Sequence, residues 1–232
     1  MLSLFLSLIA CYGYLNVKKE SLQIFSPQQI FYFSLFHNYF LHVFSITTFG
    51  YLCSVLIKNG VRAEIGYYYN IPGVSDILLF FYLSKYYEFL DTMIIYAKGK
   101  DPIFLQKFHH VGAVIFWHFG YVYRMEGFFF ATLYNSCVHT VMYMYYLLTL
   151  FPHLQINVYK YKVYITSLQF IQLFVGVITL TYYFYDIESE QNRLVILGFD
   201  AYILALLVLF GQFMVKNYFK GKPRFPQWRL AP

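Results

Sequence analysis

Residues 128–151 read FFFATLYNSCVHTVMYMYYLLTLF, and this stretch contains no Asp, Glu, Lys or Arg. A helix of about 20 mainly apolar residues crosses the ~30 Å hydrocarbon core of a bilayer, so the stretch is long enough to span a membrane. Asn135 and His139 lie within it, one helical turn apart. We therefore predict a membrane-spanning helix that carries two strongly polar side chains.

The rest of the chain repeats this pattern of long apolar runs. We find seven of them, at residues 1–15, 29–57, 75–97, 103–123, 128–151, 164–185 and 194–218. Charged and helix-breaking residues separate the runs. Because the bilayer interior excludes unpaired backbone groups, each run is predicted to be a helix. The first run is short, and a cleaved signal segment is the alternative interpretation for it.

The composition also indicates a membrane protein. Of the 232 residues, 59% are hydrophobic and only 12% are charged, against about 25% charged residues in soluble domains. The net charge of +6 does not favour a nucleic-acid partner, because the Lys and Arg residues are scattered among apolar runs. Cys11, Cys53 and Cys137 lack metal-site spacing, and an odd number cannot close a disulfide framework. We predict one all-α integral membrane domain over residues 1–232.

The distribution of basic residues predicts the orientation of the chain. Lys and Arg gather in the first, third and fifth connecting segments and in a basic tail, residues 216–232. The alternate segments hold only Lys58, Arg62, Arg124 and Arg193. Cytoplasmic segments retain an excess of Lys and Arg, so we predict a cytosolic C-terminus and, with seven spans, an N-terminus on the other side.

Ionisable side chains within spans are costly and usually mark a pathway or a reaction site. In the third run, Lys85, Glu88 and Asp91 recur every three residues and share a helix face, with Thr92 close by. The polar positions of the next three runs are Gln106, His109 and His110, then Asn135 and His139, and finally Thr166, Gln169 and Gln172. Hydrogen bonds and salt bridges between helices are the structural alternative for these residues.

The histidines at 109, 110 and 139 exceed what packing requires, because carboxylates and amides accompany them. One hypothesis is a metal held by His109 or His110, His139 and a carboxylate. The other is nucleophilic and acid–base chemistry by imidazole, which needs no metal. Cys137 points to a different helix face from His139, so we do not predict it to be the nucleophile. The histidines predicted to be packing or interfacial residues are His37, His42, His118 and His153.

These motifs resemble those of the very-long-chain fatty acid elongase (ELO) family, the membrane 3-ketoacyl-CoA synthases. Three of the family's boxes are complete, namely Lys-x-x-Glu-Phe-x-Asp-Thr from Lys85, Asn-x-x-Val-His-x-x-Met-Tyr-x-Tyr-Tyr from Asn135 and Thr-x-x-Gln-x-x-Gln from Thr166. The His-x-x-His-His box departs from the pattern at its first position, which is Gln106 here. The four boxes follow one another in the family's order within residues 85–172.

The resemblance implies seven helices, six of them forming a barrel around an acyl-chain tunnel in the endoplasmic reticulum membrane. It implies an acyltransferase that condenses a long-chain acyl-CoA with malonyl-CoA, giving a 3-oxoacyl-CoA two carbons longer, CO2 and CoA. His109 would carry the acyl group as an acyl-imidazole, with His110 as the alternative carrier. His139 and Asn135 would position the reacting groups. Neither a metal nor a tightly bound cofactor is implied.

The remaining expectations concern the substrates and partners. The substrate-binding candidates in and beside the boxes are Lys85, Glu88, Asp91, Thr92, Gln106, Tyr143, Tyr146, Thr166, Gln169 and Gln172. Lys98, Lys100 and Lys107 are placed to meet CoA phosphates, or serve only to set the topology. Besides the two substrates and the bilayer, we consider other elongation-cycle enzymes and a second copy of the chain as partners. A seven-span transporter or receptor with a buried polar site is the competing class.

Overall fold

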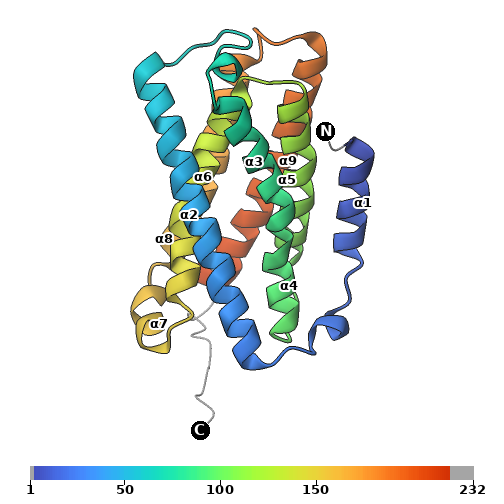
Figure 1. Ribbon diagram of the computed structural model, residues 1–232, viewed down its shortest axis with the longest axis vertical. Coiled ribbons are helices and arrows are strands. Elements are labelled where there is room, and N and C mark those ends of the chain that lie inside the picture. The colour runs from blue at the N-terminus through green and yellow to red at the C-terminus, as the bar shows by residue number, and fades with distance from the viewer. Residues whose placement is uncertain (1–2, 220–232) are drawn as a thin grey trace.

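The computed structural model describes residues 3–219, and within this range all the regular secondary structure is helical (Figure 1). The helices are α1 (Leu4–Leu15), α2 (Pro27–Asn59), α3 (Val74–Tyr87), α4 (Phe89–Ala97), α5 (Phe104–Val122), α6 (Gly127–Leu148), α7 (Pro152–Tyr159), α8 (Lys162–Thr179) and α9 (Glu190–Met214). The shorter turns are η1 (Lys19–Leu22), η2 (Tyr68–Asn70), and the π-helical η3 (Leu180–Phe184) and η4 (Val215–Phe219). The all-α prediction is confirmed for the described residues.

The predicted apolar runs correspond closely to these helices. The third run differs, because it is divided at Glu88 into α3 and α4. A short additional helix, α7, lies in a segment that we predicted to be a connection. Three helical segments are long and apolar enough to cross a membrane, namely Pro27–Asn59, Lys162–Tyr182 and Glu190–Phe219. These segments indicate a membrane protein.

Local sequence signals fix the ends of the longest helix. Ser26 and Gln29 form a capping box at the start of α2, where the Ser26 hydroxyl accepts from the Gln29 N–H and the Gln29 side chain accepts from the Ser26 N–H. Pro27 occupies the first helical position, where its missing N–H costs nothing. Gly60 follows the helix with a φ of 72°, a left-handed conformation that favours glycine.

The long helices contact one another in a closed sequence. Helix α2 packs along α6, α6 packs on α8, α8 on α9, α9 on α5, and α5 on α3. Both α3 and α4 return to contact α2. Helix α1 packs against α5 from outside this group, beside the bundle (Figure 1). The helices other than α1 and α7 therefore form a closed bundle.

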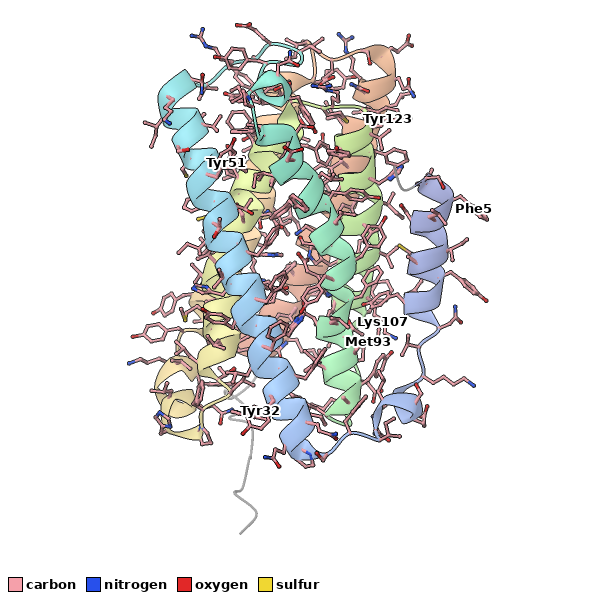
Figure 2. All side chains as sticks on the ribbon, in the orientation of Figure 1. Phe5, Tyr32, Tyr51, Met93, Lys107 and Tyr123 are labelled. Carbon is pink, nitrogen blue, oxygen red and sulfur yellow. The ribbon has the colours of Figure 1, made fainter. Side chains whose placement is uncertain are left out.

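Large apolar side chains cover the outside of the bundle as well as filling its core. Phe36 on α2, Phe174 on α8 and Leu204 on α9 are more than half exposed. Phe5 also points away from the bundle on α1 (Figure 2). Apolar surface of this extent is typical of a protein that faces lipid.

The two ends of the bundle differ in their connections (Figure 1). One end carries the α1–α2, α4–α5 and α6–α8 connections, and the other carries the α2–α3, α5–α6 and α8–α9 connections. The first end is the lysine-rich end, with Lys18, Lys98, Lys100 and Lys160. Of the predicted basic tail, residues 220–232 lie outside the described residues.

At the opposite end, the connections between helices pack around buried acidic side chains. Glu126, in the α5–α6 connection, is fully buried, and its Oε2 accepts from the Tyr68 N–H at 3.1 Å. The Glu126 N–H donates to Oε1 of Glu188 at 3.2 Å. Burial raises the pKa of Glu126 from 4.5 to about 7. These connections therefore pack around a carboxyl group whose pKa lies close to neutral pH.

Candidate active site

A cavity of about 410 Å³, here called the main cavity, lies inside the bundle and is lined from α2, α4, α5, α6, α8 and α9 and by Glu88, which lies between α3 and α4. It extends inward from Lys98 and Lys162, at the lysine-rich end, to His109, Asn135 and Gln172. A second space of about 20 Å³, the inner chamber, shares these last three residues with the main cavity. His109, Asn135 and Gln172 therefore line both spaces.

The four sequence boxes converge on the main cavity. The predicted site residues that line it are Glu88, Asp91, Lys98, Gln106, His109, His110, Asn135, His139, Tyr143, Tyr146, Thr166, Gln169 and Gln172. Lys85 and Thr92 join this set through hydrogen bonds to lining residues. Residues far apart in sequence thus meet at one place, although their chemical roles stay predictions.

Lys85 organises the centre of the site. Its Nζ donates to Oε1 of Glu88 and to Oδ1 of Asn135, each at 2.8 Å. The Lys85 side chain is only 1% exposed, and its Nζ lies 4.0 Å from the centre of the Phe81 ring. A charge buried this deeply requires a partner of opposite charge, which Glu88 supplies. Because the Asn135 oxygen is bonded to Lys85, its amide NH2 group is the part that remains to contact a substrate.

His139 is buried next to this group. Its Nδ1 lies 3.6 Å from Oε1 of Glu88, which is a close electrostatic contact but too long for a strong hydrogen bond. Its ring contacts the Tyr143 ring edge to face, with centroids 5.4 Å apart. The carboxylate and the tyrosine ring thereby limit the orientations of the imidazole.

Asp91 has two hydrogen-bonding partners, Tyr143 and His37. Its Oδ2 accepts from the Tyr143 hydroxyl at 2.8 Å, and its Oδ1 is 2.9 Å from Nε2 of His37. His37, predicted to be a packing or interfacial residue, is fully buried on α2, and its contact with Asp91 shows that the expected lack of polar neighbours was wrong. Only the pairing of α2 with α4 brings His37 to Asp91, and no spacing in the sequence signals it.

Thr92 links the outlying helix α1 to the site. Its Oγ1 is 2.8 Å from the Tyr14 hydroxyl and accepts from Nε2 of Gln106 at 3.2 Å. Gln106, the position that departs from the His box, therefore bonds to Thr92 while also lining the main cavity. No motif in the sequence distinguishes Tyr14, which lies in the short first apolar run.

The two adjacent histidines of α5 differ in their surroundings. His109 contacts Tyr202 of α9, whose hydroxyl is 3.2 Å from Nδ1 and donates to the His109 carbonyl oxygen at 2.9 Å. His110 lies against the rings of Tyr14 and Phe89, and its Nδ1 is buried with no hydrogen-bond partner among residues 3–219. Like His37 and Tyr14, Tyr202 is a site residue that the sequence boxes do not contain.

The polar stripe of α8 lies on the side of the main cavity opposite α4. Thr166 Oγ1 donates to the Lys162 carbonyl oxygen and is 3.1 Å from the Tyr218 hydroxyl. Gln169 Nε2 lies 3.1 Å from Sδ of Met142 on α6. Gln172 is the member of the stripe that lines both spaces, as His109 does.

The three lysines predicted to meet CoA phosphates lie in different surroundings. Lys98 is exposed and lines the main cavity at its lysine-rich end. Lys107 lies on α5 (Figure 2), and its Nζ is 5.3 Å from the centre of the Tyr96 ring. Lys100 is exposed in the turn after α4. Of the three, Lys98 is the one at the cavity.

The metal hypothesis requires at least three ligating side chains close together. Within residues 3–219, no three His, Cys, Asp or Glu side chains lie close enough together to hold a metal ion.

Comparison with known proteins identifies the family. The sequence model of the ELO family, described as the GNS1/SUR4 family, matches residues 1–225. The chain belongs to the ELO family. Among its relatives, fatty acid elongase A of Dictyostelium discoideum is 32% identical over 92% of this chain and 83% of its own length. Human very long chain fatty acid elongase 1 is 30% identical over 89% of this chain and 78% of its own.

Other ELO relatives match over a shorter range. Fatty acid elongase sre1 of Dictyostelium discoideum is 33% identical over 69% of this chain, which spans 57% of that protein. Very long chain fatty acid elongase 4 of Trypanosoma cruzi is 30% identical over 62% of this chain, which spans 53% of the relative. The chain therefore covers little more than half the length of these two elongases.

Proposed function

We propose that this ELO protein is a 3-oxoacyl-CoA synthase, which joins a long-chain acyl-CoA to malonyl-CoA in fatty acid elongation. The observation that carries the proposal is the convergence of His109, His139 and Asn135 on one buried cavity. Membership of the ELO family and relatives named fatty acid elongases support it. The overall reaction consumes one proton and gives the 3-oxoacyl-CoA, CO2 and CoA.

In the first half of the proposed reaction, a ring nitrogen of His109 attacks the thioester carbon of the acyl-CoA. The N–C bond forms, the C–S bond breaks, and CoA leaves as a thiolate. The amide NH2 of Asn135 is the donor that we assign to the carbonyl oxygen, because Lys85 occupies the other side of that amide. Lys85 and Glu88 hold Asn135 in place for this role.

In the second half, the bond between the malonyl α-carbon and its carboxylate breaks, and CO2 leaves. The electron pair left on the α-carbon forms a bond to the acyl carbon, and the His109 nitrogen departs. His139 and the pair formed by Asp91 and Tyr143 are assigned to holding the malonyl thioester in position. The product remains a CoA thioester that is two carbons longer than the acyl substrate.

The proposed architecture is a seven-span protein in which six spans form a barrel around the acyl-chain tunnel. The closed sequence of helix contacts and the main cavity inside it support this arrangement. Helix α1 is then the seventh span, outside the barrel. An acyl chain gains about 0.8 kcal/mol for each CH2 group that it buries, so an apolar tunnel favours long chains.

We further propose that the lysine-rich end faces the cytosol and that the membrane is the endoplasmic reticulum. Lys98, at the cytosolic mouth, would then meet the phosphates of CoA. Both acyl-CoA and malonyl-CoA would enter from this side. Thr166, Gln169 and Gln172 would contact the substrates along α8, and other elongation enzymes would receive the product at the membrane.

The test is an assay of the purified protein with a long-chain acyl-CoA and labelled malonyl-CoA. We expect a labelled 3-oxoacyl-CoA two carbons longer than the substrate, and none from a His109→Ala variant that folds normally. A transporter or receptor would form no such product. Failure of the folded parent protein to form the product would contradict the proposal.

A further inference from the structure

We propose that Tyr202 is a positioning residue that fixes the tautomer of His109 and leaves Nε2 as the reacting nitrogen. This inference rests on the proposed acyl-imidazole chemistry and extends it to a residue outside the four sequence boxes. It also supplies a physical reason why His109, and not His110, is the acyl carrier.

The Tyr202 hydroxyl makes two contacts with His109. Tyr202 Oη lies 2.9 Å from the His109 carbonyl oxygen and 3.2 Å from Nδ1 of the same residue. A carbonyl oxygen carries no hydrogen, so the phenol must donate its single hydrogen there. The phenol oxygen can then act only as an acceptor towards Nδ1. His109 therefore carries its hydrogen on Nδ1, and the lone pair of the neutral ring is on Nε2.

The ring of Tyr202 is held where this contact requires it. It is stacked on Phe116, with ring centroids 5.1 Å apart and planes inclined by 24°, and Phe108 and Phe199 also contact it. Gly112, one helical turn after His109, allows the close approach, because a Cβ at that position would overlap the Tyr202 ring. The tyrosine is 7% exposed, so water competes little for its hydroxyl.

The fixed tautomer suits the proposed reaction. When Nε2 attacks the thioester carbon, positive charge develops on the ring, and the Nδ1–H becomes a stronger donor. Tyr202 Oη already accepts this hydrogen, so the bond strengthens as the charge forms. His110 has no such contact, because its Nδ1 is buried without a partner among residues 3–219.

The substitution Tyr202→Phe tests the proposal, because it keeps the ring and removes both hydrogen bonds. We expect CoA release from acyl-CoA alone to slow by about 10 to 100-fold, with little change in the KM for acyl-CoA. Nitrogen NMR of histidine-labelled protein should show the Nδ1–H form of His109 in the parent and a mixture of both tautomers in Tyr202→Phe. A role in stability alone would not change the tautomer.

Tyr69→Phe is the matched control. Tyr69 also donates a buried hydrogen bond to a carbonyl oxygen of α5, that of Gly120, at the opposite end of the helix. We expect this variant to keep the parent's CoA release and His109 tautomer. An unchanged rate and tautomer in Tyr202→Phe would overturn the proposal for Tyr202. A parent protein that releases no CoA from acyl-CoA would instead overturn the proposed function.

Discussion

At the scale of single residues, the site is organised by polar atoms that already have partners. The Lys85 ammonium donates to the side-chain oxygen of Asn135 and to the carboxylate of Glu88. The Tyr202 hydroxyl contacts Nδ1 of His109. Each of these contacts leaves one defined group of Asn135 or His109 for chemistry. The sequence boxes predict which side chains meet, and the hydrogen bonds indicate which atoms remain to react.

Gln106 stands where the family's His box has its first histidine, so substitutions at this position test what the difference changes. Its amide donates to Thr92 and cannot titrate, so its contribution is a hydrogen bond and not acid–base catalysis. We expect Gln106→His to keep substantial activity, since imidazole also forms hydrogen bonds. Gln106→Leu should lose about 10 to 100-fold in elongation rate, measured at matched membrane expression. A Leu variant as active as the parent would make Gln106 a packing residue.

The buried pair of Lys85 and Glu88 gives a stability prediction. Lys85→Met leaves Glu88 as an unpaired buried carboxylate, which typically costs about 3 to 5 kcal/mol. The double variant Lys85→Met/Glu88→Gln removes both charges and should regain most of the parent's thermal stability in detergent. It should stay inactive, because Asn135 has lost its partner. Equal stability of the single and double variants would contradict this account of the pair.

At the scale of elements, the connections at the end opposite the lysine-rich end depend on buried Glu126. Its pKa of about 7 in the folded protein exceeds the value of 4.5 expected when unfolded. The folded state therefore binds the proton more tightly, and this stabilisation is complete below pH 4.5 and is lost as the pH rises through about 7.

We accordingly expect the parent's Tm to fall by a few degrees between about pH 5 and pH 8. Glu126→Gln should show a smaller fall over the same range, because a glutamine does not titrate. Thermal unfolding of both proteins in one detergent measures the difference. Identical pH dependence of the two Tm values would show that Glu126 does not cause the effect.

At the scale of the whole molecule, hydrophobic patterning was sufficient to predict the helices that follow the seven apolar runs, but not the short helix α7. The boxes that meet were recognised from the type and spacing of their polar residues. The break at Glu88 was not predictable, because the apolar run continues through it. The partnership of His37 with Asp91 depends on how α2 and α4 align, which no local pattern records. Tyr202 is one of 26 tyrosines, and its contacts with His109 and Gly112 arise only from the packing of α9 on α5.

The proposed topology is a property of the whole molecule. A protease-sensitive tag at Pro232 should be cut in sealed microsomes, whereas a tag between Asp186 and Gln191 should be protected, because basic segments stay in the cytosol. Both tags should be cut after detergent is added, which controls for accessibility. The reverse pattern would place the lysine-rich end on the lumenal side, away from cytosolic acyl-CoA.

The most direct test of the central claim uses the protein with acyl-CoA and no malonyl-CoA. We expect release of CoA and an added acyl mass on the peptide that contains His109. Because acyl-imidazoles hydrolyse readily, the adduct has to be trapped under mild conditions. Malonyl-CoA added before trapping should remove the mass and give the 3-oxoacyl-CoA. The His109→Ala variant should form neither adduct nor product. An acyl mass on another residue, or full elongation by His109→Ala, would contradict the account.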